Sequence, residues 1–448
     1  MIIFAYIISF AIGWLIIETL LKNKNPFCIS LQIPLAFALG LGISSLLTFI
    51  SFLIGNGLHI WFVIGLNLLV LLILIFINKT NTACCVPTIK FSWSNIALTF
   101  FWIALYISIY TLSYRHPFGE WDAWALWNMK SKFLIFAGEN WKAIFTDLHG
   151  HSQPDYPLLL PFIHTWSYCF SQQELIPIPR ITAVAFATLC PMLLYGGLAQ
   201  FAKKRIALMA TGIIVINPFY IFLATAQYAD ILISFYLLAS IITLISTLRY
   251  QNNSLALLCG LFLGLMTFIK NEGIVFMLLL AALFSFFILY ENRRHWKLLG
   301  HLAAGIALTA CATIFFKLFL APPNKDILAN LTNVELTFFN LKGLMIVKNA
   351  ILHEFLHKRW CLVWLFLSFL FVIGVPKFFK KECKIITLFF ISYFLVILYI
   401  YLTTINFDLT WRLKSTLHRI LFYLLPSLLF FGFYVHWRND EIKNASNT

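Results

Sequence analysis

Apolar runs of about 20 residues recur along this sequence and are separated by short polar or charged segments. A bilayer core about 30 Å thick needs roughly 20 apolar residues for each helical crossing. The pattern therefore predicts an all-α, polytopic integral membrane protein with about 13 transmembrane helices. The predicted spans are residues 2–21, 30–54, 58–78, 95–113, 181–201, 206–224, 229–248, 254–269, 273–290, 298–320, 361–375, 385–403 and 419–436.

Composition supports the membrane assignment. The 448 residues are 61% hydrophobic and 11% charged, whereas an ordinary soluble domain is about 25% charged. No basic soluble domain with interleaved aromatic residues is predicted, so nucleic-acid binding is not expected. The nine cysteines show no spacing typical of a disulfide framework or a cysteine-based zinc site.

The positions of Lys and Arg predict the orientation of the chain. Basic residues, for example those at 203–205 and 293–297, fall in every second loop between the spans. Such residues accumulate on the cytoplasmic side, and they also favour contact with anionic lipids. We therefore expect an external N-terminus, a cytoplasmic C-terminus and long external loops at residues 114–180, 321–360 and 404–418.

The sequence predicts one integral membrane domain, because no tandem repeat or flexible linker divides it. Residues 1–90 are expected to form accessory N-terminal transmembrane helices, since the first long external loop follows only the fourth span. Residues 91–448 are expected to carry the functional site in the three external loops.

The first external loop contains "FGEWDAWALWNMKSKF", where Trp and charged residues are concentrated. Indole rings at this spacing are typical of the water–lipid boundary, which predicts that Trp121, Trp124 and Trp127 lie there. Asp122, at the mouth of a span and flanked by aromatic rings, is expected to be partly desolvated and able to accept a proton. Further candidate substrate-binding residues of this stretch are Glu120, Lys130 and Lys132.

Further along the same loop, "HSQPDYPLLLPFIHTWSYCF" joins a polar turn to a short apolar stretch. Its prolines prevent a regular helical start, so the segment is predicted to lie along the membrane surface or to dip in and return. Asp155 and Tyr156 would then face the same external space as Asp122.

Two later spans have ionisable residues at their predicted outer ends. Asp230 opens the span at 229–248, and Lys270 and Glu272 lie between the two following spans. An ionisable residue at membrane depth usually marks a site or an ion pair. For Lys270 and Glu272 two interpretations stay open: a turn that caps the next helix, or a cation for a lipid phosphate held by Glu272.

The last external loop again mixes acid, indole and base, as in "FDLTWRLKSTLHRI". Asp408 is a candidate substrate-binding residue. Arg419 is the stronger phosphate candidate, because a guanidinium can bind two phosphate oxygens and stays charged.

The order of these features resembles the polytopic glycosyltransferases of the GT-C fold. The shared features are an acid in the first long external loop, the Pro–aromatic turn of "PDYP", "QYADILISFY" opening a span, "GLMTFIKNEG" ending one, and a basic late loop. Within that group the chain is most similar to the branch of the protein O-mannosyltransferases and lipid A aminoarabinose transferases. The similarity covers residues 95–320 in order and 404–426 more loosely.

The resemblance implies a GT-C-like architecture with juxtamembrane helices in the first external loop. It also implies an enzyme that takes a sugar from a polyprenyl-phosphate donor at the external, periplasmic face. The acceptor would be a hydroxyl of a protein, lipid or glycan. We accordingly expect an integral protein of a bacterial inner membrane that contacts membrane lipids and has no certain cofactor.

The resemblance also implies roles for individual residues. Asp122 would be the general base of an inverting transfer. Lys270 and Arg419 would stabilise the leaving lipid phosphate. Asp230 would bind the acceptor, orient a cation or hold a metal.

At one position the sequence departs from the family pattern. The aminoarabinose transferases carry a lysine before the prolines of the juxtamembrane turn, where this chain has Asp155. The phosphate contact is then expected from Lys130, Lys132 or Lys270.

Three alternatives stay open. "HEFLH" at 353–357 matches the H-E-x-x-H zinc signature, which would indicate a membrane zinc peptidase. Intramembrane charges could also serve a transporter or flippase for a lipid-linked or anionic substrate, although inverted repeats and broken helices are not evident. A divalent cation would bind Asp122, Asp155 and Asp230 only if the fold brought them together.

Overall fold

The computed structural model describes residues 1–22, 25–80, 93–172, 175–291, 293–323, 341–379, 381–403 and 408–438. Helices dominate these residues, which include no strand, and the all-α prediction is confirmed. The α-helices are α1 (Ile2–Leu21), α2 (Ile29–Gly55), α3 (Ile60–Thr80), α4 (Trp93–Ser113), α5 (Asn128–Phe136), α6 (Leu159–Ser171), α7 (Pro177–Ala199), α8 (Lys204–Val215), α9 (Pro218–Ala226), α10 (Asp230–Tyr250), α11 (Asn253–Thr267), α12 (Asn271–Glu291), α13 (Lys297–Phe319), α15 (Leu341–Leu356), α16 (Val363–Phe378), α17 (Lys381–Thr403) and α18 (Leu409–Trp437).

Each predicted span corresponds to helical structure in the described part of the chain. Ten helices there are long and apolar enough to cross a membrane, and the shorter apolar helices α11 and α16 match two further predicted spans. The predicted span 206–224 is instead two helices, α8 and α9, bent by 68°. Asn217 caps α9 and Pro218 is its first residue, so the backbone of α8 cannot continue through this point. This break was not evident from the sequence.

Helix α18 begins ten residues before the predicted span. Residues 404–407 of the predicted external loop lie outside the described residues, and most of the remainder of that loop is helical. Asp408 accepts a hydrogen bond from the backbone N–H of Thr410 and so caps the helix. Arg419 consequently lies inside α18 and not at its outer boundary. Of the predicted loop 321–360, residues 324–340 also fall outside the described residues.

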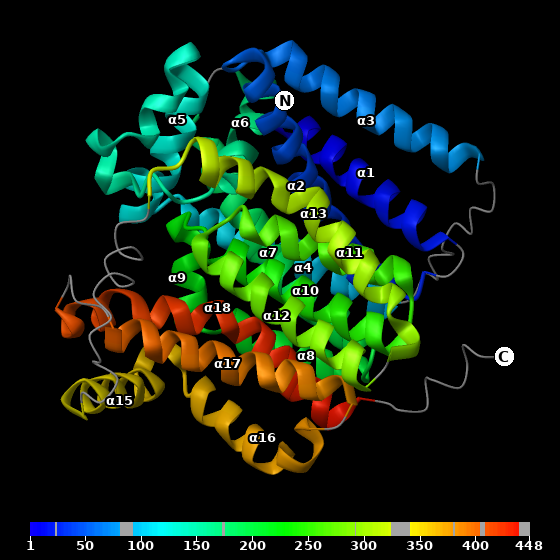
Figure 1. Cartoon of the computed structure of the whole chain (residues 1–448), viewed down its shortest axis with the longest axis vertical. Helices are drawn as coiled ribbons and strands as arrows, with labels where there is room; N and C mark the ends of the chain where they lie inside the picture. The colour runs from blue at the N-terminus through cyan, green and yellow to red at the C-terminus, as the bar shows by residue number, and fades with distance from the viewer. Residues whose placement is uncertain are drawn as a thin grey trace.

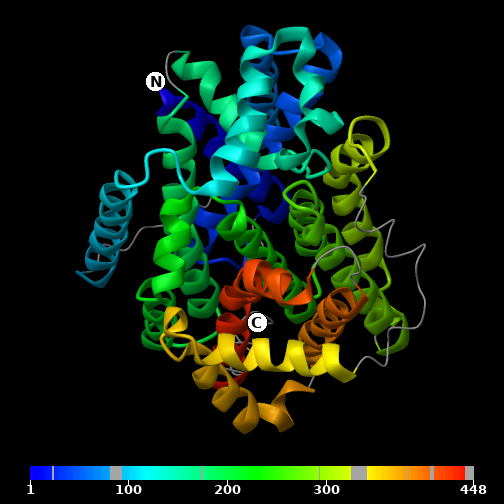
Figure 2. The same cartoon turned by 90° about the vertical axis from the view of Figure 1, so that its left-hand side faces the viewer.

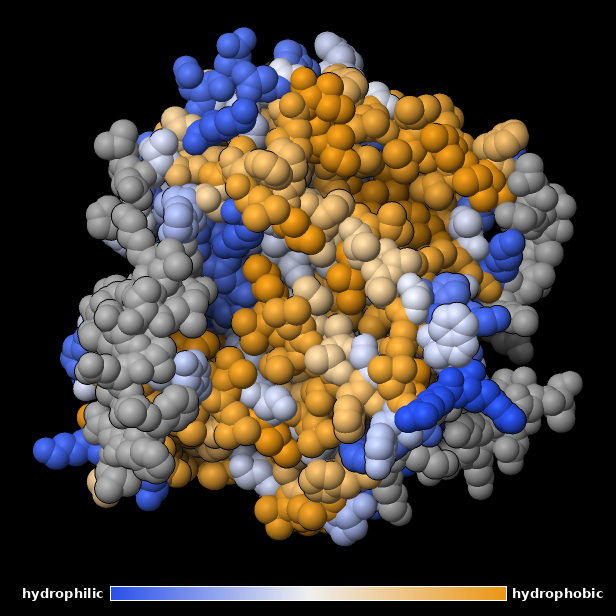
Figure 3. Space-filling model, in the orientation of Figure 1, coloured by the Kyte–Doolittle hydropathy of each residue, from blue (hydrophilic) through white to orange (hydrophobic). Residues whose placement is uncertain are grey.

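Helix α10 lies at the centre of the bundle, between α7, α11 and α18 (Figure 1). All of its apolar segment is buried, whereas α3 and α4 are mostly exposed. The exposed apolar side chains of α3 contribute to the broad hydrophobic surface of Figure 3, which suits contact with lipid. Helices α1 and α2 belong to the same hydrophobic core as α10, and the accessory role of residues 1–90 stays a prediction.

The first long loop folds into the predicted juxtamembrane helices. They are α5, α6, the π-helix η2 (Ala123–Trp127) and the 3-10 helices η3 (Gly138–Phe145) and η4 (Asp147–Ser152). Helix α6 is too short to cross, and the ring N–H of its Trp166 donates to the Ser9 hydroxyl of α1 at 2.9 Å. In Figure 1 α5, α6 and α9 lie at the left, opposite the C-terminus. Figure 2 looks onto that end, where α15 (yellow) runs below the juxtamembrane helices.

Close glycine contacts fix α11 against α13. A Cβ atom on Gly260 would lie 2.2 Å from the carbonyl oxygen of Leu302, and one on Gly305 would lie 2.2 Å from that of Leu257. Small residues at such crossings let two helix backbones approach closely. Because Lys270 follows the C-terminal end of α11, this packing also determines where its side chain lies.

We expect Gly260→Ala to force α11 and α13 apart and to destabilise the fold by about 1–3 kcal/mol, the usual effect of overpacking. Thermal unfolding of the purified protein in detergent would measure this. Gly65→Ala in α3 is the matched control, because no atom lies within 4 Å of its added Cβ. Equal unfolding temperatures for the two variants would contradict the proposed close packing.

Candidate active site

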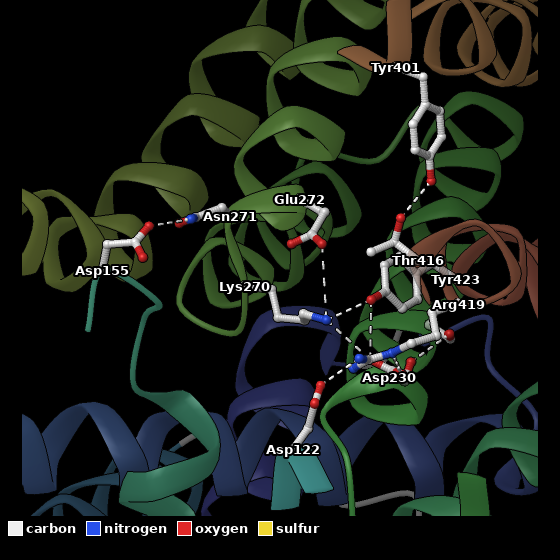
Figure 4. Close-up of polar contacts among 11 residues, drawn as sticks. Asp122, Asp155, Asp230, Lys270, Asn271, Glu272, Tyr401, Thr416, Arg419 and Tyr423 are labelled. Atoms are coloured by element: carbon white, nitrogen blue, oxygen red, sulfur yellow. Dashed lines mark hydrogen bonds and ion pairs between the residues drawn. The ribbon is translucent and has the colours of Figure 1, made fainter. Parts of the chain in front are cut away.

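Four charged side chains from separate parts of the chain meet in one cluster. Asp122 immediately precedes η2, Asp230 opens α10, Lys270 lies between α11 and α12, and Arg419 belongs to α18. Figure 4 shows them joined by a continuous series of polar contacts. We call these four residues the charged cluster.

Asp230 is its centre. The Lys270 ammonium lies 3.1 Å from Oδ1, and Arg419 donates through Nε to Oδ2 at 2.6 Å and through Nη2 to Oδ1 at 3.0 Å. The Tyr423 hydroxyl donates to Oδ1 at 3.2 Å. Asp230 is fully buried and Lys270 is 3% exposed. Two cations thus share one carboxylate out of contact with water, where charges persist only if they are paired and hydrogen-bonded.

Arg419 connects Asp230 to Asp122. Its Nη1 donates to Asp122 Oδ2 at 2.5 Å. The ring of Tyr228 lies 4.8 Å from the guanidinium carbon and supports it from one side. Burial raises the pKa of Tyr228 to about 12, so this phenol keeps its proton at neutral pH. Arg419 therefore has a fixed orientation, with one edge on each carboxylate.

A junction between the first external loop and the turn before α10 brings Asp122 to Arg419. The backbone N–H of Glu120 donates to the carbonyl of Ala226 at 3.1 Å. Gln227 has a positive φ of 60° and donates its side-chain amide to the carbonyls of His116 and Pro117. These bonds fasten the chain on both sides of Gly119, close to Asp122.

Asp155 and Tyr156 lie beside the charged cluster. Asn271 donates to Asp155 Oδ2 at 2.8 Å, and Lys317 forms an ion pair with the same carboxylate at 3.7 Å. The ring of Tyr156 lies 5.8 Å from the Lys270 ammonium. Burial and neighbouring charges, Glu272 above all, raise the pKa of Tyr156. Tyr156 thus lies beside Lys270, and Asp155 contacts the next residue, Asn271. Their predicted convergence with Asp122 stays a prediction.

Lys130 holds the juxtamembrane turn through two backbone carbonyls. Its ammonium donates to the carbonyls of Gln153 at 2.7 Å and Tyr156 at 3.1 Å. The side chain is fully buried, and burial lowers its pKa from 10.5 to about 7. In this position Lys130 supports the turn that carries Asp155 and Tyr156.

The remaining sequence candidates lie apart from the charged cluster, except Glu272, whose Oε1 is 4.0 Å from the Lys270 ammonium. Glu120 pairs with His116 at 3.0 Å, Lys132 is exposed, and Asp408 caps α18. Glu272 lies in the first turn of α12, and Lys270 reaches Asp230. The lipid-phosphate interpretation of this turn stays a prediction.

The tryptophan prediction was partly wrong. Trp121 is 60% exposed and Trp124 46%, but Trp127 is fully buried beneath the loop. Trp127 turns inward because it packs against Tyr156 at a ring distance of 6.0 Å. Only the first two indoles are therefore available to a membrane surface.

Sequence reasoning missed Tyr228 and Tyr423 as members of the site. Tyr423 follows Arg419 by four residues, a spacing that places both on one face of a helix. That spacing could have identified Tyr423 once α18 was known to begin early. No comparable signal marks Tyr228, because it reaches Arg419 only through the turn between α9 and α10.

The "HEFLH" stretch does not form a metal centre in the described residues, where no group of three or more His, Cys, Asp or Glu side chains could hold an ion. The Glu354 carboxylate accepts from the Trp360 ring N–H at 3.1 Å and pairs with Arg359 at 3.8 Å. His357 caps the 3-10 helix η7 (Lys358–Trp360). Nor do Asp122, Asp155 and Asp230 form such a group, and the side chains of Lys270 and Arg419 already pair with Asp230.

We expect Asp230→Asn to destabilise the protein by about 3–5 kcal/mol, because it leaves the buried Lys270 and the partly buried Arg419 without their shared carboxylate. Thermal unfolding in detergent would measure the loss. Asp408→Asn is the control, because Asn replaces Asp well at a helix N-cap. An unchanged unfolding temperature for Asp230→Asn would refute the central role of this carboxylate.

Lys130 predicts a specific pH dependence of stability. Because its pKa is lower in the folded protein, the unfolded chain binds more protons between pH 7 and 10.5. The folded state should therefore gain stability as pH rises through this window. The rise in unfolding temperature from about pH 7 to about pH 10 should be smaller in Lys130→Met than in wild type or Lys132→Met. The same rise in all three proteins would argue against the lowered pKa.

One comparison with known proteins gives a family match. Residues 155–316 match the family model described as dolichyl-phosphate-mannose-protein mannosyltransferase. The chain has no significant match among curated proteins or solved structures. The matched segment contains Asp155, Asp230, Lys270 and Glu272, while Asp122 and Arg419 lie outside it. The match confirms the resemblance stated above and supports a membrane glycosyltransferase of the GT-C type.

Proposed function

We propose that this protein is an inverting glycosyltransferase that moves a sugar from a polyprenyl-phosphate donor to an acceptor hydroxyl at the external face of the membrane. The observation that carries the proposal is the charged cluster. A carboxylate for the incoming hydroxyl and cations for a phosphate lie within one series of direct contacts. The acceptor would be a protein, lipid or glycan.

The two acids of the cluster differ in exposure, and this difference separates their roles. The Asp122 side chain is 20% exposed, while that of Asp230 is fully buried between two cations. An acceptor hydroxyl can therefore reach Asp122. Asp230 instead keeps Arg419 and Lys270 in place, which favours cation orientation among its three expected roles.

The cations suit a leaving phosphate. Arg419 is 17% exposed and Lys270 3%, so the guanidinium is the first cation that an entering phosphate meets. Fixed positive charge beside a phosphate stabilises the negative charge that develops as the glycosidic bond breaks. Lys270 lies deeper and adds to the same field.

The proposed reaction is a single displacement. The acceptor oxygen forms a bond to the anomeric carbon while the bond from that carbon to the phosphate oxygen breaks. The hydroxyl proton passes to Asp122, and the electron pair of the broken bond leaves with the polyprenyl phosphate. Attack opposite the leaving group inverts the configuration.

An apolar groove supports a lipid-borne donor. It has a volume of about 450 Å³ and is lined mainly by side chains of α16, α17 and α18, together with Phe355 of α15. Leu421 and Leu424 line it from α18, within about two helical turns of Arg419. A polyprenyl chain in this groove would bring its phosphate to the outer part of α18.

The location of these features also supports the proposed external face. The juxtamembrane helices, α9 and the start of α18 share one end of the molecule, opposite the C-terminal end (Figure 1). The basic residues at 203–205 and 293–297, which predict the cytoplasmic side, lie at the start of α8 and between α12 and α13. The bend between α8 and α9 is a feature that transporters share, but the family match favours transfer over transport.

Asp122→Asn should lower kcat for sugar transfer by at least about 100-fold, because a general base contributes this much or more. Donor affinity, yield and unfolding temperature should change little. The measurement is transfer of radiolabelled sugar from a panel of polyprenyl-phosphate sugars by protein in lipid. Glu139→Gln, an exposed change in η3 away from the cluster, is the control. Full turnover by folded Asp122→Asn protein would exclude Asp122 as the base.

A further inference from the structure

Two buried oxygen atoms beside the charged cluster have no hydrogen-bond partner. They are Asn271 Oδ1 and Glu272 Oε2, on consecutive residues in the first turn of α12. Buried polar atoms are almost always paired in proteins, so an unpaired one calls for an explanation. Glu272 lies next to Lys270, and the Asn271 side chain lies on the Asp155 side of the same turn (Figure 4).

The orientation of the Asn271 side chain is determined by its neighbour. Its Nδ2 donates to Asp155 Oδ2 at 2.8 Å. A carboxylate only accepts hydrogen bonds, so the reversed amide would place two acceptors against each other. The Lys317 ammonium in turn pairs with the Asp155 carboxylate and donates a hydrogen bond to the Asp155 backbone carbonyl. Asn271 Oδ1 is therefore an acceptor that lacks a donor.

Glu272 Oε2 is also an acceptor without a donor. Its Oε1 is 4.0 Å from the Lys270 ammonium, beyond hydrogen-bond distance, and Lys270 already binds Asp230 and Tyr423. The side chain is 25% exposed, so a ligand can approach it although Oε2 itself is covered. The carboxylate thus has unused capacity to accept hydrogen bonds.

The chemistry of these atoms selects their ligand. Both are acceptors, so the group that satisfies them must donate, as a hydroxyl does. A phosphate cannot do so, because its charged oxygens accept and would be repelled by Glu272. In the proposed complex the phosphate lies on Arg419 and Lys270, and the group attached to that phosphate is the sugar.

We propose that Asn271 and Glu272 form the subsite that recognises hydroxyl groups of the transferred sugar. This inference rests on the proposed function, since it takes the Lys270 side of the cluster as the phosphate position. Glu272 then contributes to specificity by accepting a hydrogen bond from a sugar hydroxyl, while Asp155 orients Asn271 for the same purpose. An acceptor substrate carrying hydroxyl groups is the other source of this chemistry, and the test separates the two.

The test measures binding of undecaprenyl phosphate, with and without an attached sugar, to the full-length protein in detergent, without an acceptor. The probes are undecaprenyl phosphate and undecaprenyl phosphate that carries mannose, glucose, galactose or aminoarabinose. Glu272→Gln should weaken binding of the sugar-bearing lipid that wild type prefers by about 10-fold or more, the usual effect of losing a hydrogen bond to a charged group. Binding of undecaprenyl phosphate should not change. The control is Glu139→Gln.

Monodeoxy analogues of the preferred sugar identify the hydroxyl. Wild type and Glu272→Gln should bind one analogue with equal affinity. This is the analogue that lacks the hydroxyl bound by Glu272, because its hydrogen bond to the carboxylate is already absent. The subsite is refuted if Glu272→Gln weakens the binding of undecaprenyl phosphate and of its sugar-bearing form alike, or of neither. It is also refuted if the ratio of the wild-type and Glu272→Gln affinities is the same for every analogue. Glu272→Ala repeats the test should Glu272→Gln protein be poorly folded. Wild type that binds no polyprenyl phosphate at all would instead refute the proposed function.

Discussion

The site depends on one buried carboxylate that two cations share. Asp230 has no exposed surface and holds both Arg419 and Lys270. Each buried charge would be strongly unfavourable alone, and together they persist because every partner is hydrogen-bonded. This requirement joins the start of α10, the turn before α12 and the outer part of α18 at one point. Arg419 then reaches Asp122 in the first external loop.

The two acids of the charged cluster differ in exposure, and the roles proposed for them follow this difference. The fully buried Asp230 balances the charges of Lys270 and Arg419. The more exposed Asp122 forms an ion pair with Arg419. A second set of contacts, from Lys130 through the carbonyl of Tyr156 to the Asp155–Asn271 pair, positions the juxtamembrane turn beside it. The apolar groove along α18 lies on the helix that supplies Arg419. The lipid chain, the phosphate and the acceptor hydroxyl of the proposed reaction would thus all bind near α18.

Several site residues were identifiable from the sequence because charge is conspicuous in an apolar chain. Asp122, Asp230, Lys270 and Arg419 were each singled out by position at a span end, and the structure brings all four together. The same reasoning also selected Glu120, Lys132 and Asp408, which lie apart from them. A charged residue at the surface and one in a site have similar sequence surroundings. Only the partner decides between them, and partners here are 40 to 297 residues apart.

The sequence by itself determined the fold class and the positions of nearly all membrane helices, because burial in lipid demands long apolar helices. It could not locate the bend at Asn217 and Pro218 or the early start of α18, where local cap chemistry and distant ion pairs override hydropathy. The tertiary structure alone decided which charges pair, that Trp127 turns inward and that Lys130 supports a turn. Those outcomes depend on packing between segments far apart in the chain, which no local pattern encodes.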